Sequence, residues 1–331
     1  MATKKIPNLI QFDGLIKLRD DETDNRYGHK AFERPIDELL EYGIILLDKP
    51  SGPTSHEVAS WVKRMLTIKK TGHSGTLDPG ATGLLPMGLG EGTKALSVLL
   101  MGPKEYYSVA RIHSHIPSHK IDLIIQEFCN EIYQRPPQRS SVKRITRIRK
   151  IYELESIEFS DQLFLLRILC QAGTYIRKLI YDIGEVLGSG ATMIELRRTR
   201  VNNFFEKDGL VKLHDLNSAF VLYKEKNEEQ KIRRMIKPIE ECLTDIPSVI
   251  IRDTAVDALC HGAQLAIPGI SLLSKKIEVG SLVGIYTLKR EIVGLAEAIM
   301  STQDIVLSKN GIAFIMKRLI MKPNTYPKGW K

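Results

Sequence analysis

The sequence is poor in cysteine and has no long apolar run, and both absences exclude classes of protein. Its four cysteines are widely spaced and form no Cys-x-x-Cys pair, so we expect neither a disulfide framework nor a cysteine-bound zinc ion. Apolar runs such as residues 43–47 and 163–166 are far shorter than the roughly 20 residues that span a membrane. Residues 1–7 contain no apolar stretch of the kind found in a secretory signal. We therefore expect a protein of a reducing compartment with no membrane partner.

Positive charge, in contrast, is in excess. Lys and Arg number 48 against 39 Asp and Glu, which leaves a formal net charge of +9. Such a charge favours a polyanionic partner, and RNA or DNA comes before a membrane because no basic amphipathic segment stands out. The 331 residues exceed what one hydrophobic core usually holds, so we expect two domains.

Hydrophobic spacing predicts an α+β fold, with a mixed or antiparallel sheet and helices, over most of the chain. Thr54 or Ser55 is placed to cap a helix that reaches Met65. The glycine-rich stretch 72–92 matches neither the helical nor the strand period and is interpreted as a structured loop. The remaining predictions are strands at residues 43–47, 109–112 and 164–170, and helices at residues 121–132, 176–187 and 217–241.

A smaller β-rich module is predicted after Pro247. Short apolar segments alternate there with glycines, which is typical of a β-barrel-like domain, and we place the boundary at residues 246–248. Its predicted strands are residues 249–251, 282–285, 292–296 and 312–316. The polar residues 1–35 allow two interpretations, a mobile tail or an arm packed on another domain.

The segment around Asp78 is the first candidate for chemistry. Asp78-Pro79 lies among glycines within residues 72–83, and such a dipeptide is most often only a turn. The functional alternative is that the glycines let another backbone approach while the loop presents one carboxylate. A carboxylate can act as a covalent nucleophile at a sugar carbon or at a polarised ring carbon.

A second candidate segment, residues 170–179, ends a predicted strand and opens a predicted helix. Tyr175 and Arg177 lie where a strand end projects side chains into a cleft. An arginine there would hold a nearby carboxylate ionised, and an aromatic ring could stack on a base. The alternative is that Arg177 caps surface carbonyls and Tyr175 fills the core.

Basic residues gather in two further places. One run contains no acidic residue, and we favour phosphate contact over a merely solvated face for it. It comprises Arg135, Arg139, Lys143, Arg144, Arg147, Arg149 and Lys150. A second basic group near the proposed cleft comprises Arg197, Arg198 and Arg200.

Motifs for nucleotide or metal binding are missing from the sequence. Residues 88–94 superficially resemble a phosphate-binding loop but lack the order Gly-Lys-Ser/Thr. The histidines at positions 113, 115 and 119 have no supporting cysteine pair or His-Glu-x-x-His motif, so we expect no metal site.

Five motifs in order are similar to those of TruB-type pseudouridine synthases. They are Lys49-Pro50-x-Gly52, residues 75–79 (GTLDP), residues 104–106 (KEY), residues 173–177 (GTYIR) and residues 196–200 (LRRTR). The sequence segments at residues 48–58 and 134–137 resemble those of the archaeal and eukaryotic branch, the dyskerin-like H/ACA synthases. Residues 261–270 resemble a PUA RNA-binding domain, so that His261 and Gly262 are expected in an RNA-binding surface.

This resemblance implies a role for each matched residue. Asp78 would be the nucleophile, and Arg177 its ion-pair partner, neutralising a buried charge. Tyr106 would stack on the flipped base and Tyr175 would accept a proton. His73 would pack near the flipped-out site, and Lys49 would support the loop. One departure is Val201-Asn202-Asn203, where the family commonly has Ser-Gly-Pro; another is Lys178, where a small residue is usual.

The resemblance also implies partners and a division of the chain. The partners are an H/ACA guide RNA, a substrate rRNA or tRNA, two small H/ACA accessory proteins and a kink-turn-binding ribosomal-type protein. No cofactor is implied, because isomerisation of uridine needs no redox change. The location would be cytoplasmic for an archaeal protein and nucleolar for a eukaryotic one. The division is an extension (1–35), a synthase domain (36–246), a PUA domain (247–325) and a tail (326–331).

Three rival interpretations remain at the level of sequence. The first is a stand-alone tRNA synthase that recognises its loop without a guide. The second is a non-catalytic RNA scaffold, although a relic need not retain Asp78, Tyr106, Tyr175 and Arg177 together. The third is a general basic RNA-binding module, which leaves the glycine-rich Asp78 loop unexplained.

Overall fold

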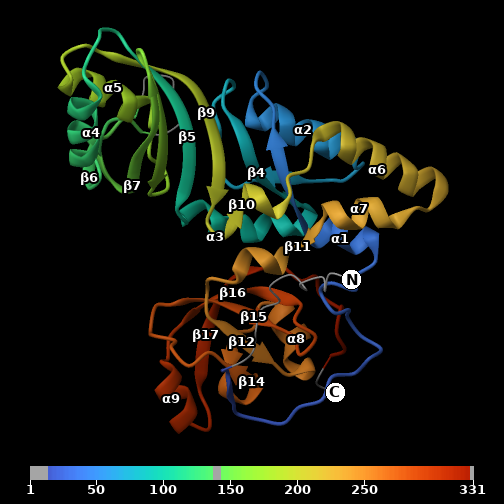
Figure 1. Cartoon of the computed structure of the whole chain (residues 1–331). Helices are drawn as coiled ribbons and strands as arrows, with labels where there is room; N and C mark the ends of the chain where they lie inside the picture. The colour runs from blue at the N-terminus through green and yellow to red at the C-terminus, as the bar shows by residue number, and fades with distance from the viewer. Residues whose placement is uncertain (1–13, 137–142, 329–331) are drawn as a thin grey trace, which may run out of the picture.

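Two β-sheets form the framework of the molecule in the computed structural model, which describes residues 14–136 and 143–328 (Figure 1). The larger sheet has ten strands in the order β11-β2-β4-β9-β5-β8-β7-β6, with β10 beside β9 and β3 beside β4. Its β4 and β9 are parallel, and its other strand pairs are antiparallel. The predicted α+β fold with a mixed sheet is confirmed.

The strands of the larger sheet are β2 (Gly43–Lys49), β3 (Thr71–His73), β4 (Thr82–Leu89), β5 (Lys104–Ile112), β6 (Glu131–Gln134), β7 (Arg147–Ser160), β8 (Leu163–Cys170), β9 (Ala191–Val201), β10 (Phe204–Phe205) and β11 (Lys237–Pro238). The helices of this half are α1 (Ile36–Tyr42), α2 (Ser55–Met65), α3 (Leu96–Met101), α4 (Ser118–Glu127), α5 (Ile176–Val186), α6 (Leu213–Lys226) and α7 (Glu229–Met235). Helices α4 and α5 cover one end of the sheet, and α2 and α6 lie at the other (Figure 1).

The smaller sheet has seven strands in the order β1-β14-β12-β15-β16-β17-β13. They are β1 (Ile16–Lys17), β12 (Ser248–Ile251), β13 (Leu265–Ala266), β14 (Ile270–Leu273), β15 (Leu282–Tyr286), β16 (Ile292–Ala298) and β17 (Ile312–Leu319), with helices α8 (Asp253–Cys260) and α9 (Thr302–Leu307). Each of the four strands predicted in this region is present.

Several predicted elements differ from the structure. The stretch 72–92, interpreted as a loop, contains the end of β3 and all of β4, whose residues from Gly83 onward are buried. The helix predicted at 121–132 ends at Glu127, and β6 begins four residues later. The charged stretch 217–241 holds two helices, because Asn227 takes a left-handed conformation (φ +55°) that ends α6.

The N-terminal segment from Gly14 to Pro35 is an arm packed on the smaller sheet. Ile16 and Lys17 pair with Leu273 and Leu272 and thereby extend that sheet by β1. Further along the arm, the Lys289 ammonium donates a hydrogen bond to the Asp24 carbonyl at 2.9 Å. The described residues of this segment therefore form an arm packed on another part of the molecule, which was the second of the two interpretations.

A shared hydrophobic core joins the two sheets. One cluster of buried residues contains Ile44 and Leu46 of β2 together with Tyr286 of β15, Ile292 of β16 and Ile320. The halves therefore pack as one unit, and the position of the smaller sheet relative to the larger is set by apolar burial.

Candidate active site

The loop that carries Asp78 connects β3 to β4, and buried side chains hold it in place. Lys49, at the end of β2, donates hydrogen bonds to the carbonyl oxygens of Pro50, Pro79 and Ala81 at 2.9, 3.0 and 2.8 Å. Lys49 is 0% exposed, and burial lowers the pKa of its ammonium. Its support of the loop agrees with the role that the resemblance implies, and its side chain is buried and does not reach the surface where RNA would bind.

Helix α2 holds the same loop on its N-terminal side. Thr54 caps the helix through a capping box with Glu57, which fixes the first turn. In that turn the Ser55 hydroxyl accepts the Leu77 N–H at 2.9 Å and donates to the Leu77 carbonyl at 3.2 Å. The backbone on the immediate N-terminal side of Asp78 is therefore tied to a helix end.

Arg198 in β9 is a third support for the loop. Its guanidinium donates to the carbonyls of Leu84 at 2.9 Å and Gly75 at 3.1 Å, on either side of Asp78 along the chain. Arg198 is only 1% exposed. The prediction that Arg198 contacts RNA is therefore wrong, because its guanidinium is buried and donates hydrogen bonds to backbone carbonyls inside the fold.

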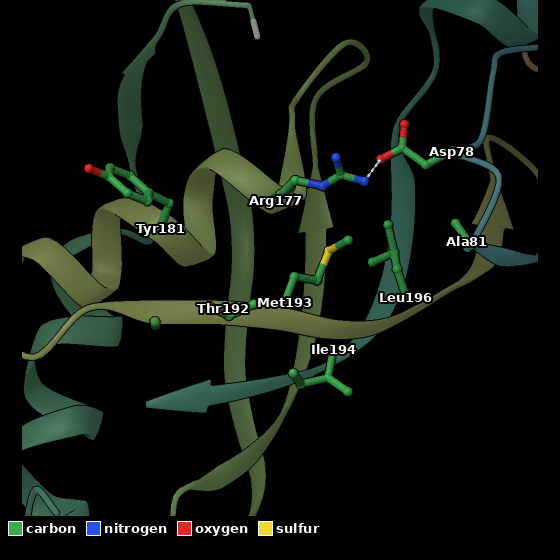
Figure 2. A pocket seen from close by; sticks show the side chains of 10 residues that line it. Asp78, Ala81, Arg177, Tyr181, Thr192, Met193, Ile194 and Leu196 are labelled. Carbon is green, nitrogen blue, oxygen red and sulfur yellow. Dashed lines mark hydrogen bonds and ion pairs between the residues drawn. The ribbon is translucent and has the colours of Figure 1, made fainter. Parts of the chain in front are cut away.

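Asp78 and Arg177 form the predicted ion pair. The Arg177 Nη2 lies 2.6 Å from the Asp78 Oδ2, although the two residues are 99 positions apart in sequence (Figure 2). Their side chains are 51% and 65% exposed, so the expectation of a buried charge is wrong for the chain without RNA. An exposed pair adds at most about 1 kcal/mol to stability. Its value here is geometric, because Arg177 orients the carboxylate over the adjoining cavity.

That cavity, of about 420 Å³, lies between the Asp78 loop, α5 and the first half of β9. Met193 and Leu196 project from β9 toward the ion pair, and Tyr181 stands on α5 beyond Arg177 (Figure 2). The lining residues are Asp78, Gly80, Ala81, Arg177, Tyr181, Ala191, Thr192, Met193, Ile194 and Leu196. The cavity is thus polar where the ion pair lies and mainly apolar along β9, which suits a heterocyclic base.

The other two residues predicted to be catalytic, Tyr106 and Tyr175, are not among the residues that line this cavity. Tyr106 of β5 is in register with Arg198 and packs in one hydrophobic cluster with Leu77 and Ala81, the neighbours of Asp78. Its burial raises the pKa of the Tyr106 phenol. Tyr175 precedes α5, and the Gln134 side chain holds its backbone, accepting from the Tyr175 N–H at 2.9 Å and donating to its carbonyl at 3.1 Å.

His73 ends β3 at the start of the same loop. Its ring meets that of His56 edge to face, with centroids 5.0 Å apart and an interplanar angle of 63°. Burial lowers the pKa of His73 to about 4, and the neighbouring His56 contributes in the same direction. His73 is therefore a neutral, half-buried ring at neutral pH.

The basic residues predicted to contact RNA differ in how exposed their side chains are to solvent. Lys143 and Arg144 are exposed in the segment just before β7, where the Arg144 Nε donates to the Pro136 carbonyl at 3.3 Å. Arg147 is half-buried in β7 itself, and Arg139 lies outside the described residues. The segment just before β7 therefore presents exposed positive charge at Lys143.

In the second basic group, Arg197 is neutralised by two carboxylates, whereas Arg198 and Arg200 donate to backbone carbonyls. Arg197 pairs with Asp48 at 3.1 Å and with Glu206, whose carboxylate accepts its Nε at 3.0 Å. Both carboxylates raise the pKa of Arg197. Arg200 donates to the Asn202 carbonyl at 2.7 Å and lies 4.8 Å from the ring centroid of Phe205.

In the smaller sheet, His261 and Gly262 follow the end of α8. The His261 Nδ1 lies 2.8 Å from the Asp257 carbonyl, and both His261 and Gly262 are exposed. Gly262 has φ +96°, a backbone conformation that other residues rarely adopt. They form a surface turn remote in the chain from Asp78.

Neither a metal centre nor a membrane-spanning helix occurs in residues 14–136 and 143–328. No group of three or more His, Cys, Asp or Glu side chains in these ranges could hold a metal ion. Among these same residues, no helix combines the length and apolarity that crossing a membrane requires.

Tyr181 is one of several cavity residues that sequence reasoning missed. It follows Arg177 by four positions in a predicted helix, and residues with this spacing share a helix face. That spacing was available as a signal, whereas the approach of Met193 and Thr192 required the packing of α5 on β9.

Five family models match the chain: the C-terminal model of Pus10 matches residues 101–201, and four others follow one another along the sequence. These four are the DKCLD (NUC011) domain at residues 3–59, the N-terminal domain of TruB family pseudouridylate synthases at 63–118, the C-terminal domain of tRNA pseudouridylate synthase B at 177–244, and the PUA domain at 247–320. The PUA match covers the strands of the smaller sheet from β12 onward.

Curated relatives and solved structures match over nearly the whole length. The chain is 48% identical to a probable tRNA pseudouridine synthase B of Methanosarcina barkeri, over 96% of this chain and 93% of that protein. It is 46% identical to the protein of the same description in Methanocaldococcus jannaschii, over 96% of this chain and 94% of that protein.

Among solved structures, an H/ACA RNP bound to a substrate RNA containing 2′-deoxyuridine matches with a TM-score of 0.88, 42% identity and 96% coverage of both chains. A Cbf5–Nop10–Gar1 complex matches with a TM-score of 0.88, 44% identity and 95% coverage of both chains. The fold and the carboxylate–guanidinium site thus define a pseudouridine synthase, an isomerase. The chain belongs to the TruB family of pseudouridylate synthases, in an architecture that combines the DKCLD and PUA domains.

Proposed function

We propose that this chain isomerises uridine to pseudouridine in rRNA as the catalytic subunit of an H/ACA guide-RNA ribonucleoprotein, with Asp78 as the nucleophile. The observation that carries the proposal is the Asp78 carboxylate, held by a clamped loop and oriented by Arg177 at 2.6 Å over a mainly apolar cavity. The solved H/ACA complexes with the same fold support the guided form of the reaction.

The reaction breaks the N1–C1′ bond of uridine, turns the base, and joins C5 to C1′. Electrons balance within the nucleoside, so the site needs no redox partner. Three roles are chemically open to the Asp78 carboxylate: attack at C1′, attack at C6, or removal of the C2′ proton. In each, the ionised carboxylate must face the ribose or the ring, and Arg177 supplies that orientation.

Flipping the uridine out of its stack costs a few kcal/mol. We assign the compensation to Tyr106, because one base–aromatic stack supplies about 1–3 kcal/mol. Tyr175 beside the site is assigned as the proton acceptor, and the neutral ring of His73 packs where the uridine leaves its helix. RNA covering the cavity would bury the Asp78–Arg177 pair, and the low dielectric of that state strengthens the pair.

The proposed partners follow from the relatives. We assign to this chain a guide RNA, two small proteins of the Nop10 and Gar1 kind and a kink-turn-binding ribosomal-type protein. The turn at His261 and Gly262 is assigned to guide-RNA contact in a PUA domain of residues 247–325, after a synthase domain of residues 36–246. The relatives named above come from methanogens, which supports a cytoplasmic location.

A second candidate function is guide-independent modification of tRNA. The observation in its favour is the description of the curated relatives as probable tRNA pseudouridine synthases B. The two functions share the same site and differ only in how RNA is presented to it.

One experiment separates these functions. The full chain is incubated with uridine-labelled rRNA fragments or tRNA, with and without a guide RNA and the small proteins, and pseudouridine is scored. The proposal expects conversion of rRNA that depends on the guide. Conversion of tRNA without a guide would replace the proposal by the second function, and RNA binding without any conversion would contradict both.

The basic residues just before β7 provide a separate test of the RNA interface. Replacing Lys143 by alanine should weaken RNA affinity and lower the slope of log affinity against log salt by about 0.7–0.9, the value for one lost phosphate contact. Lys231→Ala on α7, also exposed, is the matched control and should leave the slope unchanged. Equal slopes for wild type and Lys143→Ala would mean that this run is only a solvated face.

A further inference from the structure

Tyr181 is an aromatic residue on the cavity wall that the proposed chemistry does not use. It lies on α5 four residues after Arg177, so both side chains emerge on one face of the helix (Figure 2). The residue is 50% exposed, and it lines the same cavity as Asp78. A large ring left half open at the other end of the cavity that holds the Asp78 carboxylate is placed for stacking and contributes little to the core.

The setting of the ring restricts its orientation. The Lys178 ammonium lies 5.0 Å from the Tyr181 ring centroid, within cation–π range, and Lys178 is itself ion-paired with Asp182 in the next turn. The ring is therefore held by neighbours of its own helix.

The dimensions of the cavity leave room for more than one base. Its floor follows β9 from Ala191 to Leu196, about 16 Å at the usual rise of a strand. Along α5, Tyr181 lies about 6 Å beyond Arg177. This distance of about 6 Å exceeds the spacing of about 3.4 Å between stacked bases in one strand. The uridine that reacts at Asp78 therefore leaves the Tyr181 end of the cavity free.

We propose that Tyr181 forms a second base subsite, in which its ring stacks on the nucleotide next to the uridine that reacts. The proposal rests on the proposed function, because Asp78 marks where that uridine lies. When the uridine flips out, its neighbour loses a stacking partner, and the Tyr181 ring replaces that partner. Stacking of this kind accepts any base, since every base has a π-face, and so suits an enzyme whose target is chosen by pairing elsewhere.

The test removes either partner of the stack. Substrate RNAs carry an abasic residue at the position 5′ or 3′ of the target uridine, and kcat/KM is measured for wild type, Tyr181→Ala and Tyr181→Phe. For wild type, one of the two abasic RNAs should lower kcat/KM about tenfold or more. Tyr181→Ala should lose a similar factor on the intact RNA and lose nothing further on that abasic RNA. Tyr181→Phe, which keeps the ring, should behave as wild type.

Phe32→Ala is the matched control, because Phe32 is a partly exposed aromatic (37%) on the N-terminal arm. It should leave kcat/KM and the abasic effect unchanged. An undiminished abasic effect in Tyr181→Ala, or wild-type kcat/KM for that variant on intact RNA, would overturn the subsite. Failure of the proposed function gives a different result, namely no pseudouridine from the wild type or full activity in Asp78→Asn.

Discussion

At the scale of residues, the notable feature is buried positive charge bound to backbone carbonyls, both in the Asp78 loop and at the end of α3. Lys49, Lys104 and Arg198 are at most 5% exposed, and their side chains donate hydrogen bonds to carbonyl oxygens. Within the described part of the chain none of the three forms an ion pair with a carboxylate. Lys49 and Arg198 fix the Asp78 loop, and Lys104 fixes the end of α3. The three buried cations leave net positive charge in this half of the molecule, which favours a polyanionic substrate.

His73 gives a pH-dependent prediction at this scale. Its folded pKa of about 4 lies below the ordinary 6.5, so between these values the unfolded chain binds more protons than the folded one. The free energy of unfolding should therefore fall as pH decreases from 6.5 to 4. Urea unfolding at pH 7 and 4.5 should show a smaller decrease for His73→Gln than for wild type. His214→Gln, whose side chain is 78% exposed, is the control and should match the wild type.

The sequence predicted the Asp78–Arg177 pair but misplaced one arginine. The pair could be anticipated because both residues lie in motifs matched by a known family. Arg198 could not be placed, because neighbouring residues of a strand point to opposite faces and Arg197, Arg198 and Arg200 are equivalent in a one-dimensional list. Which of them faces inward depends on how β9 pairs with β4 and β5.

At the scale of elements, the contact of α5 with β9 sets the position of Arg177. A Cβ atom on Gly184 would lie 2.1 Å from the Ala191 backbone nitrogen, so this glycine lets the helix approach the strand. Glycine to alanine inside a helix ordinarily stabilises by about 0.5–1 kcal/mol. Here we expect Gly184→Ala to destabilise by about 1–3 kcal/mol through overpacking, and to lower activity as Arg177 moves from Asp78.

Gly188, just past the end of α5, is the comparison for that prediction. It has φ +70°, and a Cβ atom added there would meet only open space, so Gly188→Ala costs only the left-handed backbone, about 1–2 kcal/mol. Denaturant unfolding and kcat are measured for both variants. Wild-type kcat in Gly184→Ala would contradict the dependence of the site on this close approach.

The strand β4 shows why sequence reasoning failed over residues 72–92. Pro86 and several glycines interrupt its apolar pattern, and proline is unfavourable in most central strands. The Pro86 carbonyl accepts the Ser74 N–H at 3.0 Å. Since the nitrogen and carbonyl of one strand residue face the same edge, the Pro86 nitrogen also points there, beyond the end of β3 and away from β2. The missing N–H therefore breaks no ladder bond.

The departure at Val201-Asn202-Asn203 has a physical account in the β9–β10 turn. Asn202 adopts φ +53°, and asparagine tolerates this region better than most residues, so it can stand where the family has glycine. The side-chain amide of Asn202 donates to Asp245 at 2.7 Å, and that of Asn203 to Thr244 at 2.7 Å. The pair thus ties the turn to the segment that leads into the smaller sheet.

At the scale of the whole molecule, a buried ion pair joins the N-terminal arm, the 3-10 helix Ile239–Leu243 and the smaller sheet. Arg34 binds Glu240 through two hydrogen bonds of 2.9 and 2.7 Å, and the Ile292 N–H donates to the same carboxylate at 2.9 Å. Both side chains are 3% exposed. Removing one partner leaves a buried charge uncompensated, so Arg34→Met should lower the free energy of unfolding by about 3–5 kcal/mol.

Urea unfolding checks that value, with Arg26→Met as control. Arg26 also pairs with an acid, Asp24, but its side chain is 79% exposed, and its loss should leave stability nearly unchanged. A small effect of Arg34→Met would mean that the arm packs loosely and that the apolar core alone positions the two sheets.

The account as a whole depends on the carboxylate of Asp78, and Asp78→Asn tests it most directly. The variant keeps the shape of the side chain and removes its charge and nucleophilicity, and Asp161→Asn in the exposed turn between β7 and β8 is the matched control. Single-turnover yield of pseudouridine and RNA affinity are measured on the same substrate. We predict unchanged RNA affinity for both variants, wild-type yield for Asp161→Asn, and no pseudouridine for Asp78→Asn. Pseudouridine formed by Asp78→Asn at the wild-type rate would contradict the account.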